Sequence, residues 1–165
     1  MMINLFRFGG LLAALFVCAS VYAGDIEIQN AWARATAPGQ DAASVDLTIT
    51  SKHAAALVGV SSRVARTAAL HSMVTEGGMM RMREVASIDL PPGKTVNLGE
   101  SGYHLMLVGL KAPLKEGETV PLTLNIRVGK LGMVKVKTRA EVRSLTATAA
   151  PSPQNEHRQM NMQMN

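Results

Sequence analysis

Short segments of alternating apolar and polar residues, separated by glycine or proline turns, constrain the fold of this chain more than any other feature. Residues 25–32 (DIEIQNAW) and 45–50 (VDLTIT) alternate clearly, as strands do when they bury one face. Further short segments of strand character are residues 57–60, 66–75, 79–85, 94–98, 103–110, 120–128 and 133–142. Eight or nine short strands without a helix of full length predict an all-β sandwich with Greek-key connections.

The first 23 residues have the features of a cleavable signal peptide. Arg7 supplies a basic start, and FGGLLAALFVCAS is an apolar stretch too short to span a bilayer comfortably. We predict cleavage after Ala23, which makes Gly24 the first mature residue, with export to the periplasm and no stable membrane insertion afterwards. The alternatives are an uncleaved membrane anchor and a lipoprotein attached through Cys18, which follows Val17 where a small residue is expected.

Cleavage at Ala23 removes Cys18, the one cysteine of the 165-residue chain. The mature chain then lacks disulfides and thiolate ligands, so its own core must stabilise it. The formal net charge of +5 comes from scattered lysines and arginines, whereas a nucleic-acid surface usually has clustered ones. We therefore expect no nucleic-acid partner. The predicted domain covers residues 24–146.

Two histidines and two methionines form the candidate site. Ten residues separate His71 from Met82, twenty-one separate Met82 from His104, and Leu105 alone separates His104 from Met106. Imidazoles and thioethers together are a soft, neutral ligand set, and thioethers select Cu(I) over harder metals. The sequence therefore predicts one Cu(I) bound by these four residues.

A hairpin can bring the first two of these donors together. If Gly77-Gly78 forms a two-residue turn, Met73 faces Met82, and residue 71 faces residue 84. His71 and Met82 are then diagonal neighbours on one face. His104 and Met106 share a face because they are two residues apart on one strand. A register slip of one residue would instead send Met82 to the opposite face.

The other histidines and methionines receive separate interpretations. His53 lies in a polar turn and is expected to be structural. Met73, Met79 and Met80 have two alternative roles, as core residues or as auxiliary thioethers, and the core is the expectation for Met79. Met73 is the best candidate for an auxiliary thioether. The tail after residue 146 lacks Val, Ile and Leu, so we expect residues 147–165 to be disordered. His157, Met160, Met162 and Met164 in this tail are predicted to bind a second copper, as Cu(II) through the histidine or as Cu(I) through the methionines. The alternative is a disordered tail that only keeps the protein soluble.

Enzymatic and electron-transfer functions fit the sequence poorly. A blue-copper site needs a cysteine thiolate, which the mature chain lacks. A histidine brace needs an N-terminal histidine, and the predicted first residue is Gly24. The chain has no nucleophile elbow, no HExxH sequence and no phosphate-binding loop. We expect a binding protein and not an enzyme.

The spacing of His71, Met82, His104 and Met106 resembles that of the PCuAC family of periplasmic copper chaperones. The segments 30–36 (NAWARAT), 91–93 (PPG) and 104–107 (HLML) are similar to that family as well. The resemblance covers about residues 26–142. It implies a cupredoxin-like sandwich that carries Cu(I) at an exposed rim and delivers it to the CuA centre of cytochrome c oxidase, alongside a Sco-type thiol protein.

Two residues depart from the family pattern, and one alternative function stays open. Asp46 stands where an aromatic residue is expected, and Ser51 stands where Asn is expected. These departures concern the packing of one strand and leave the four donors in place. A periplasmic copper storage or tolerance protein without a dedicated oxidase acceptor would present the same donors. We expect the chain to be a monomer.

Overall fold

The computed structural model describes residues 23–100, 102–130 and 132–146, and nearly all of them belong to strands. The strands are β1 (Ile26–Arg34), β2 (Ala42–Ser51), β3 (Ala55–Ser61), β4 (Ala65–Glu76), β5 (Met79–Glu84), β6 (Ile88–Leu90), β7 (Thr95–Leu98), β8 (Tyr103–Leu110), β9 (Thr119–Val128) and β10 (Gly132–Arg143). A short 3₁₀ turn, η1 (Ala23–Asp25), precedes β1. The described residues contain no helix that is long and apolar enough to cross a membrane.

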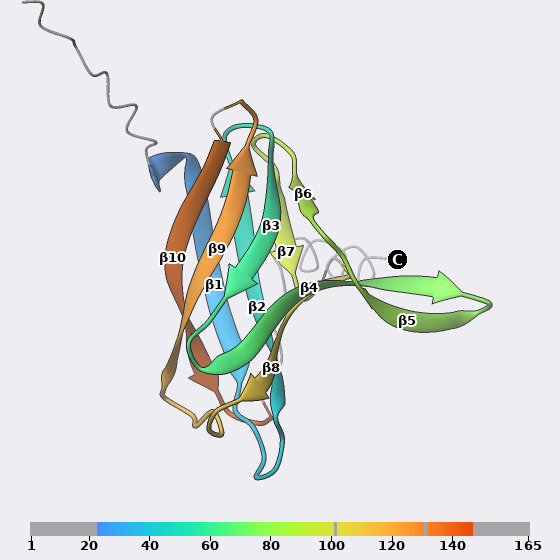
Figure 1. The fold of residues 1–165 in the computed structure, drawn as a ribbon, viewed down its shortest axis with the longest axis vertical. Coiled ribbons are helices and arrows are strands. Elements are labelled where there is room, and N and C mark those ends of the chain that lie inside the picture. Colours follow the sequence, from blue (N-terminus) through green and yellow to red (C-terminus); the bar gives the residue numbers. More distant parts are fainter. Residues whose placement is uncertain (1–22, 101, 131, 147–165) are drawn as a thin grey trace, which may run out of the picture.

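All ten strands join one hydrogen-bonded sheet in the order β5-β4-β8-β7-β2-β1-β10-β9-β3-β6. The sheet folds over on itself into a sandwich, and β3 also packs against β4 (Figure 1). β1 and β10 pair in parallel, so the first and last strands lie side by side. The prediction of an all-β sandwich is therefore confirmed, with the short strand β6 as an addition to the nine predicted segments.

The core lies between the two layers and consists almost entirely of aliphatic side chains. Its fully buried members alternate with more exposed residues along the strands, as expected for strands with one buried face. The largest of these are Leu47, Ile49, Leu57, Ile88, Leu90, Leu98, Leu105, Leu107, Leu122, Leu124 and Ile126. Branched aliphatic side chains from both layers fill the core, and Trp32 is the one aromatic residue among the buried side chains of the described segments.

The hairpin of β4 and β5 leaves this sandwich. The first half of β4 packs in the body, where Ala65 and Leu70 are buried. Its second half continues outward with β5, and the pair projects from the side of the sandwich (Figure 1). Every residue of β5 is exposed. The sheet therefore carries an arm with little core of its own.

The two ends of the chain lie outside the described residues. This applies to the predicted signal peptide up to Tyr22 and to the tail residues 147–165. The four tail candidates, His157, Met160, Met162 and Met164, belong to that second segment.

Candidate metal centre

The β4–β5 hairpin has the register that the sequence predicts. Gly77 and Gly78 have φ angles of 58° and 79°, which a two-residue turn with two left-handed positions requires. Met73 pairs with Met82, and His71 pairs with Glu84. His71 and Met82 are therefore diagonal neighbours on one face, and the predicted register is confirmed.

β8 supplies the other two candidate donors from the opposite side of β4. His104 pairs directly with His71, and Met106 pairs with Ala69. Directly opposed residues of antiparallel strands share a face, with Cβ atoms about 4.5–5.5 Å apart. The two imidazoles are thus nearest neighbours, and Met82 and Met106 lie diagonally on either side of His71. The four residues come from three adjacent strands, β5, β4 and β8.

These four residues lie on the outer face of the sheet. Leu70 and Leu105, which neighbour His71 and His104 in the chain, are buried on the inner face. His71, His104 and Met106 are half-buried, and Met82 is 45% exposed. Small residues flank Met106, because Ala69 pairs with it on one side and Ser44 on the other. The face is therefore partly open to solvent, most of all at Met82.

The ring of His71 has a nitrogen without a partner. Its Nδ1 atom is buried and makes no hydrogen bond with any described residue. Leaving a buried polar atom unsatisfied is costly and uncommon, and such an atom in a native structure calls for an explanation such as an ion. A metal ion that accepts the lone pair of this nitrogen would remove the cost, so the residues fit a bound cation.

Asp46 is a neighbour of this site that sequence reasoning missed. On β2, Val45 pairs with Leu105 of β8, whereas Leu47 pairs with Leu98 of β7. Asp46 therefore lies beside His104, at the point where β2 stops pairing with β8 and begins pairing with β7. Burial raises the pKa of Asp46, and the nearby His104 and Arg34 only partly oppose this effect. A carboxylate next to a histidine ligand can orient the imidazole ring.

Gly99 allows Asp46 to occupy this position. A Cβ atom at residue 99 would lie 2.6 Å from Oδ1 of Asp46, and the φ angle of Gly99 is 132°. Both the space and the backbone conformation therefore require glycine. The signal in the sequence was the departure itself, a carboxylate where the family pattern has an aromatic residue. The sequence does not predict the pairing of β2 with β8, so it could not show that His104 is the neighbour of Asp46.

Ser51, the second departure, closes the turn after β2. Its side chain is fully buried, and its hydroxyl donates a 2.7 Å hydrogen bond to the carbonyl oxygen of His53. The His53 ring lies 3.7 Å from the carboxylate of Asp25. His53 thus belongs to the surface turn between β2 and β3, in keeping with a structural role.

The interpretation of Met79 was wrong. We expected it in the core, but it is 58% exposed near the tip of the hairpin. Both faces of β5 are in contact with solvent, so an apolar residue on either face stays exposed. Met80 is 69% exposed on the other face.

Carboxylates and imidazoles do not by themselves form a metal site in the described part of the chain. No three His, Cys, Asp or Glu side chains gather there in an arrangement that holds an ion. Glu84 faces His71 across the hairpin, but it is exposed. The candidate donors are therefore two imidazoles with thioethers.

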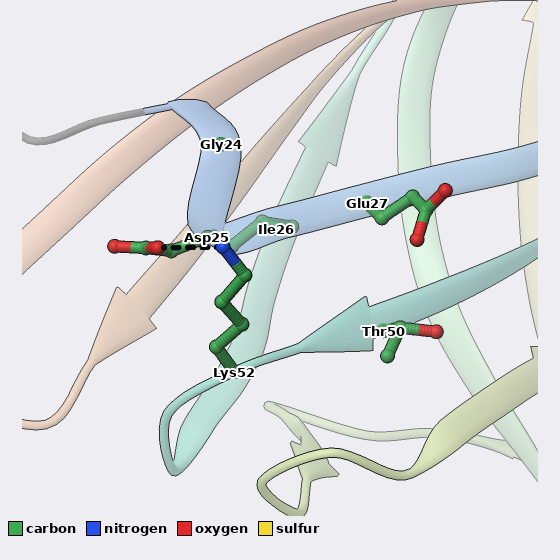
Figure 2. Close-up of a pocket in the computed structure, with 6 residues that line it drawn as sticks. All are labelled: Gly24, Asp25, Ile26, Glu27, Thr50 and Lys52. Atoms are coloured by element: carbon green, nitrogen blue, oxygen red, sulfur yellow. Dashed lines mark ion pairs between the residues drawn. The ribbon is translucent and has the colours of Figure 1, made fainter.

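A separate pocket of about 300 Å³ lies at the start of β1 and the end of β2. Figure 2 shows its lining, which includes Asp25, Glu27, Thr50 and Lys52. Lys52 makes a 3.5 Å ion pair with Asp25. Glu27 accepts a 2.6 Å hydrogen bond from the side chain of Gln29. None of the candidate metal ligands lines this pocket.

Comparison with known proteins identifies a matching family and a related protein. The family described as "Putative lipoprotein LpqE-like" matches residues 26–139. A protein of Leifsonia xyli subsp. xyli (strain CTCB07), named "Putative lipoprotein Lxx21020", is 36% identical over 118 residues, which is 71% of each chain.

Solved structures with the same fold include two copper-bound proteins. The copper-bound PCuAC domain of PmoF2 is 26% identical, with a TM-score of 0.58, and the match covers 74% of this chain and 97% of that domain. The Cu(I) form of DR1885 from Deinococcus radiodurans is 32% identical, with a TM-score of 0.54, and the match covers 69% and 75% of the two chains. The apo form of DR1885 is 29% identical, with a TM-score of 0.55, and the match covers 87% and 95%.

Proposed function

Because the chain belongs to the LpqE-like, or PCuAC, family, we propose that it is an exported copper chaperone that binds one Cu(I) through His71, Met82, His104 and Met106. The observation that carries this proposal is the direct pairing of His71 with His104 on an outer sheet face, with a methionine diagonal to His71 on each side. The buried and unpartnered Nδ1 of His71 supports it.

The chemistry of these donors suits Cu(I). Thioethers and imidazoles are neutral, so the bound ion keeps its single positive charge without an added anion. The thioethers need no deprotonation, and lowering the pH weakens binding only by protonating the imidazoles. In an oxidising compartment a pair of thiolates would form a disulfide, whereas methionines would not. The donor set is therefore suited to an exported carrier.

The position of the site suits release as well as binding. Met82 is exposed on the projecting arm, and the other donors are half-buried. An acceptor can approach this face and replace one donor at a time. No nucleophile with its base is part of the site, so the proposed role is binding and delivery and not catalysis.

We propose the CuA centre of cytochrome c oxidase as the acceptor, with a Sco-type thiol protein acting alongside. The test is anaerobic mixing of the Cu(I)-loaded mature chain with the apo soluble domain that carries the CuA ligands. Copper should move to the acceptor domain, and less should move from a Met82→Ala variant because it loads poorly. Tight binding without transfer to the CuA domain or to a Sco-type protein would favour the storage or tolerance alternative.

The tail offers a second copper site through His157, Met160, Met162 and Met164. Imidazole and thioether groups are soft donors of the kind that copper prefers. Truncation after Ala150 is expected to remove one weaker copper equivalent and to leave the tight equivalent unchanged. Copper stoichiometry by metal analysis after gel filtration checks this, and an unchanged total would refute the role of the tail.

A further inference from the structure

Three methionines line one face of the projecting arm. Met73 pairs with Met82, and Met80, which pairs with Thr75, is two residues from Met82 on β5. Side chains two residues apart on a strand share a face, so Met73, Met80 and Met82 point to the same side. This is the side that carries His71. The three thioethers therefore extend from the candidate metal centre toward the tip of the hairpin.

Packing does not account for Met80 and Met82, whereas Met73 is half-buried. Met80 is 69% exposed and Met82 is 45% exposed, and every residue of β5 is exposed. Met80 belongs to β5, and β5 projects from the sandwich (Figure 1). Exposed thioethers on a polar strand contribute little to a core, but they are available to a soft cation.

The charges on the arm are distributed in a way that suits a cation on this face. Alternation along β5 places Arg81 and Arg83 on the opposite face. There, Arg83 donates a 2.6 Å hydrogen bond to the carboxylate of Glu76. The methionine face carries Thr75 and Glu84 and no arginine. A cation on this face therefore avoids direct repulsion from either guanidinium.

We propose that Met73 and Met80, with Met82 as a shared ligand, form an outer Cu(I) site through which the ion enters and leaves the inner site. Directly paired residues have Cβ atoms about 5 Å apart and diagonal ones about 7–8 Å. Methionine has three rotatable bonds, so three sulfurs can reach one ion across these gaps. The ion remains Cu(I) throughout, and each step exchanges one neutral donor for another without proton release.

The order of the steps follows from the positions of the donors. Met80, the most exposed, meets Cu(I) first, together with Met73. Met82 then stays bound while the imidazoles of His71 and His104 replace the outer thioethers. Release to an acceptor runs in reverse. The proposal rests on the proposed Cu(I) function, and it adds a pathway that the four inner donors do not require.

The test compares Met80→Leu with Met79→Leu in the full mature chain. The two residues are adjacent, both exposed, and on opposite faces of the arm. Replacement of Met by Leu conserves volume, so both variants should fold as the parent does. The rate of Cu(I) transfer to a chromogenic chelator is measured anaerobically by stopped flow, and the equilibrium Cu(I) affinity is measured in parallel.

Met80→Leu is expected to slow Cu(I) transfer about fivefold and to leave the equilibrium Cu(I) affinity unchanged. Met79→Leu is expected to change neither the transfer rate nor the affinity. In a titration with Ag(I) beyond one equivalent, followed by NMR, the methyl signals of Met73 and Met80 should shift and that of Met79 should not. Equal rates in the parent and both variants, or equal slowing in both variants, would overturn the outer site.

Failure of the outer site and failure of the proposed function give different results. If the parent chain binds no Cu(I) tightly, the proposed function fails. If the parent binds Cu(I) tightly and His104→Ala does not, but Met80→Leu transfers copper as fast as the parent, only the outer site fails.

Discussion

The body of the sandwich and the projecting arm use apolar residues in opposite ways. In β8, Leu105 and Leu107 are fully buried and alternate with residues on the outer face. In β5, three of six residues are methionines, and all six residues are exposed. The strand β4 runs through both regions, with Leu70 buried in the body and the segment beyond His71 in the arm.

This contrast separates residues that stabilise the fold from residues that are free for chemistry. Burial of an aliphatic side chain contributes about 1.5–3 kcal/mol to folding, whereas an exposed methionine contributes little. Keeping the methionine sulfurs of the arm exposed to solvent therefore costs little stability. Substitutions in the body should therefore change stability, and substitutions on the methionine and histidine face should change copper binding.

The largest effect on stability is expected in the body, far from the site. Leu124 of β9 is fully buried, and Leu124→Ala should lower the free energy of unfolding by about 3 kcal/mol because it leaves a cavity. Chemical denaturation followed by circular dichroism measures this. The folded Leu124→Ala protein should bind Cu(I) as tightly as the parent. A large loss of Cu(I) affinity would contradict the separation between the body and the arm.

The largest effect on copper is expected from removing one donor of each type. The Met82→Ala/His104→Ala double variant should lose at least about a hundredfold in Cu(I) affinity, or roughly 2.7 kcal/mol. Its unfolding free energy without metal should change far less than in Leu124→Ala, since neither side chain is fully buried. Anaerobic competition titration gives the affinity, and unchanged tight binding would place the copper elsewhere.

A single thioether replacement sharpens the comparison within the arm. Met82→Leu should weaken Cu(I) binding about tenfold and change stability by less than about 0.5 kcal/mol. Met79→Leu, on the other face, serves as the matched control and should change neither quantity. Equal losses of affinity in both variants would mean that the face of the methionine does not matter.

The smallest effect is expected at Asp46, between the body and the site. Burial raises the pKa of this carboxyl above its ordinary value of 3.8, so the folded chain holds the proton more tightly than the unfolded chain does. The stabilising contribution is complete below pH 3.8 and is lost as the pH rises through the raised pKa. Asp46→Asn should therefore raise the melting temperature of the metal-free chain slightly at pH 7 and leave it unchanged at pH 3. A lower melting temperature at pH 7 would contradict this sign.

The sequence predicted local geometry well and long-range neighbours poorly. The paired glycines 77 and 78 restrict the hairpin to one turn, which determines the register of Met73 with Met82. The pairing of β4 with β8 joins strands that are not consecutive, and no local signal specifies it. The direct contact between the positions of His71 and His104, and the location of Asp46 beside His104, therefore came only from the structure.

Two further differences have simple physical causes. β6 (Ile88–Leu90) is too short for alternation to be recognised, although two of its three residues are buried. Met79 was expected in the core because methionine is a common core residue, but a hairpin that leaves the sandwich has no core to offer. The polar partners in its strand, Arg81 and Arg83, were the available sign that this segment is exposed.

X-ray absorption spectroscopy of the mature chain loaded with one equivalent of Cu(I) tests the central claim most directly. We predict a first shell that contains both imidazole nitrogen and thioether sulfur, from His71, His104, Met82 and Met106. The sulfur contribution should decrease in Met106→Leu, and the nitrogen contribution should decrease in His71→Ala. A shell made only of nitrogen and oxygen, or only of sulfur, would contradict the assignment of the metal centre to this face.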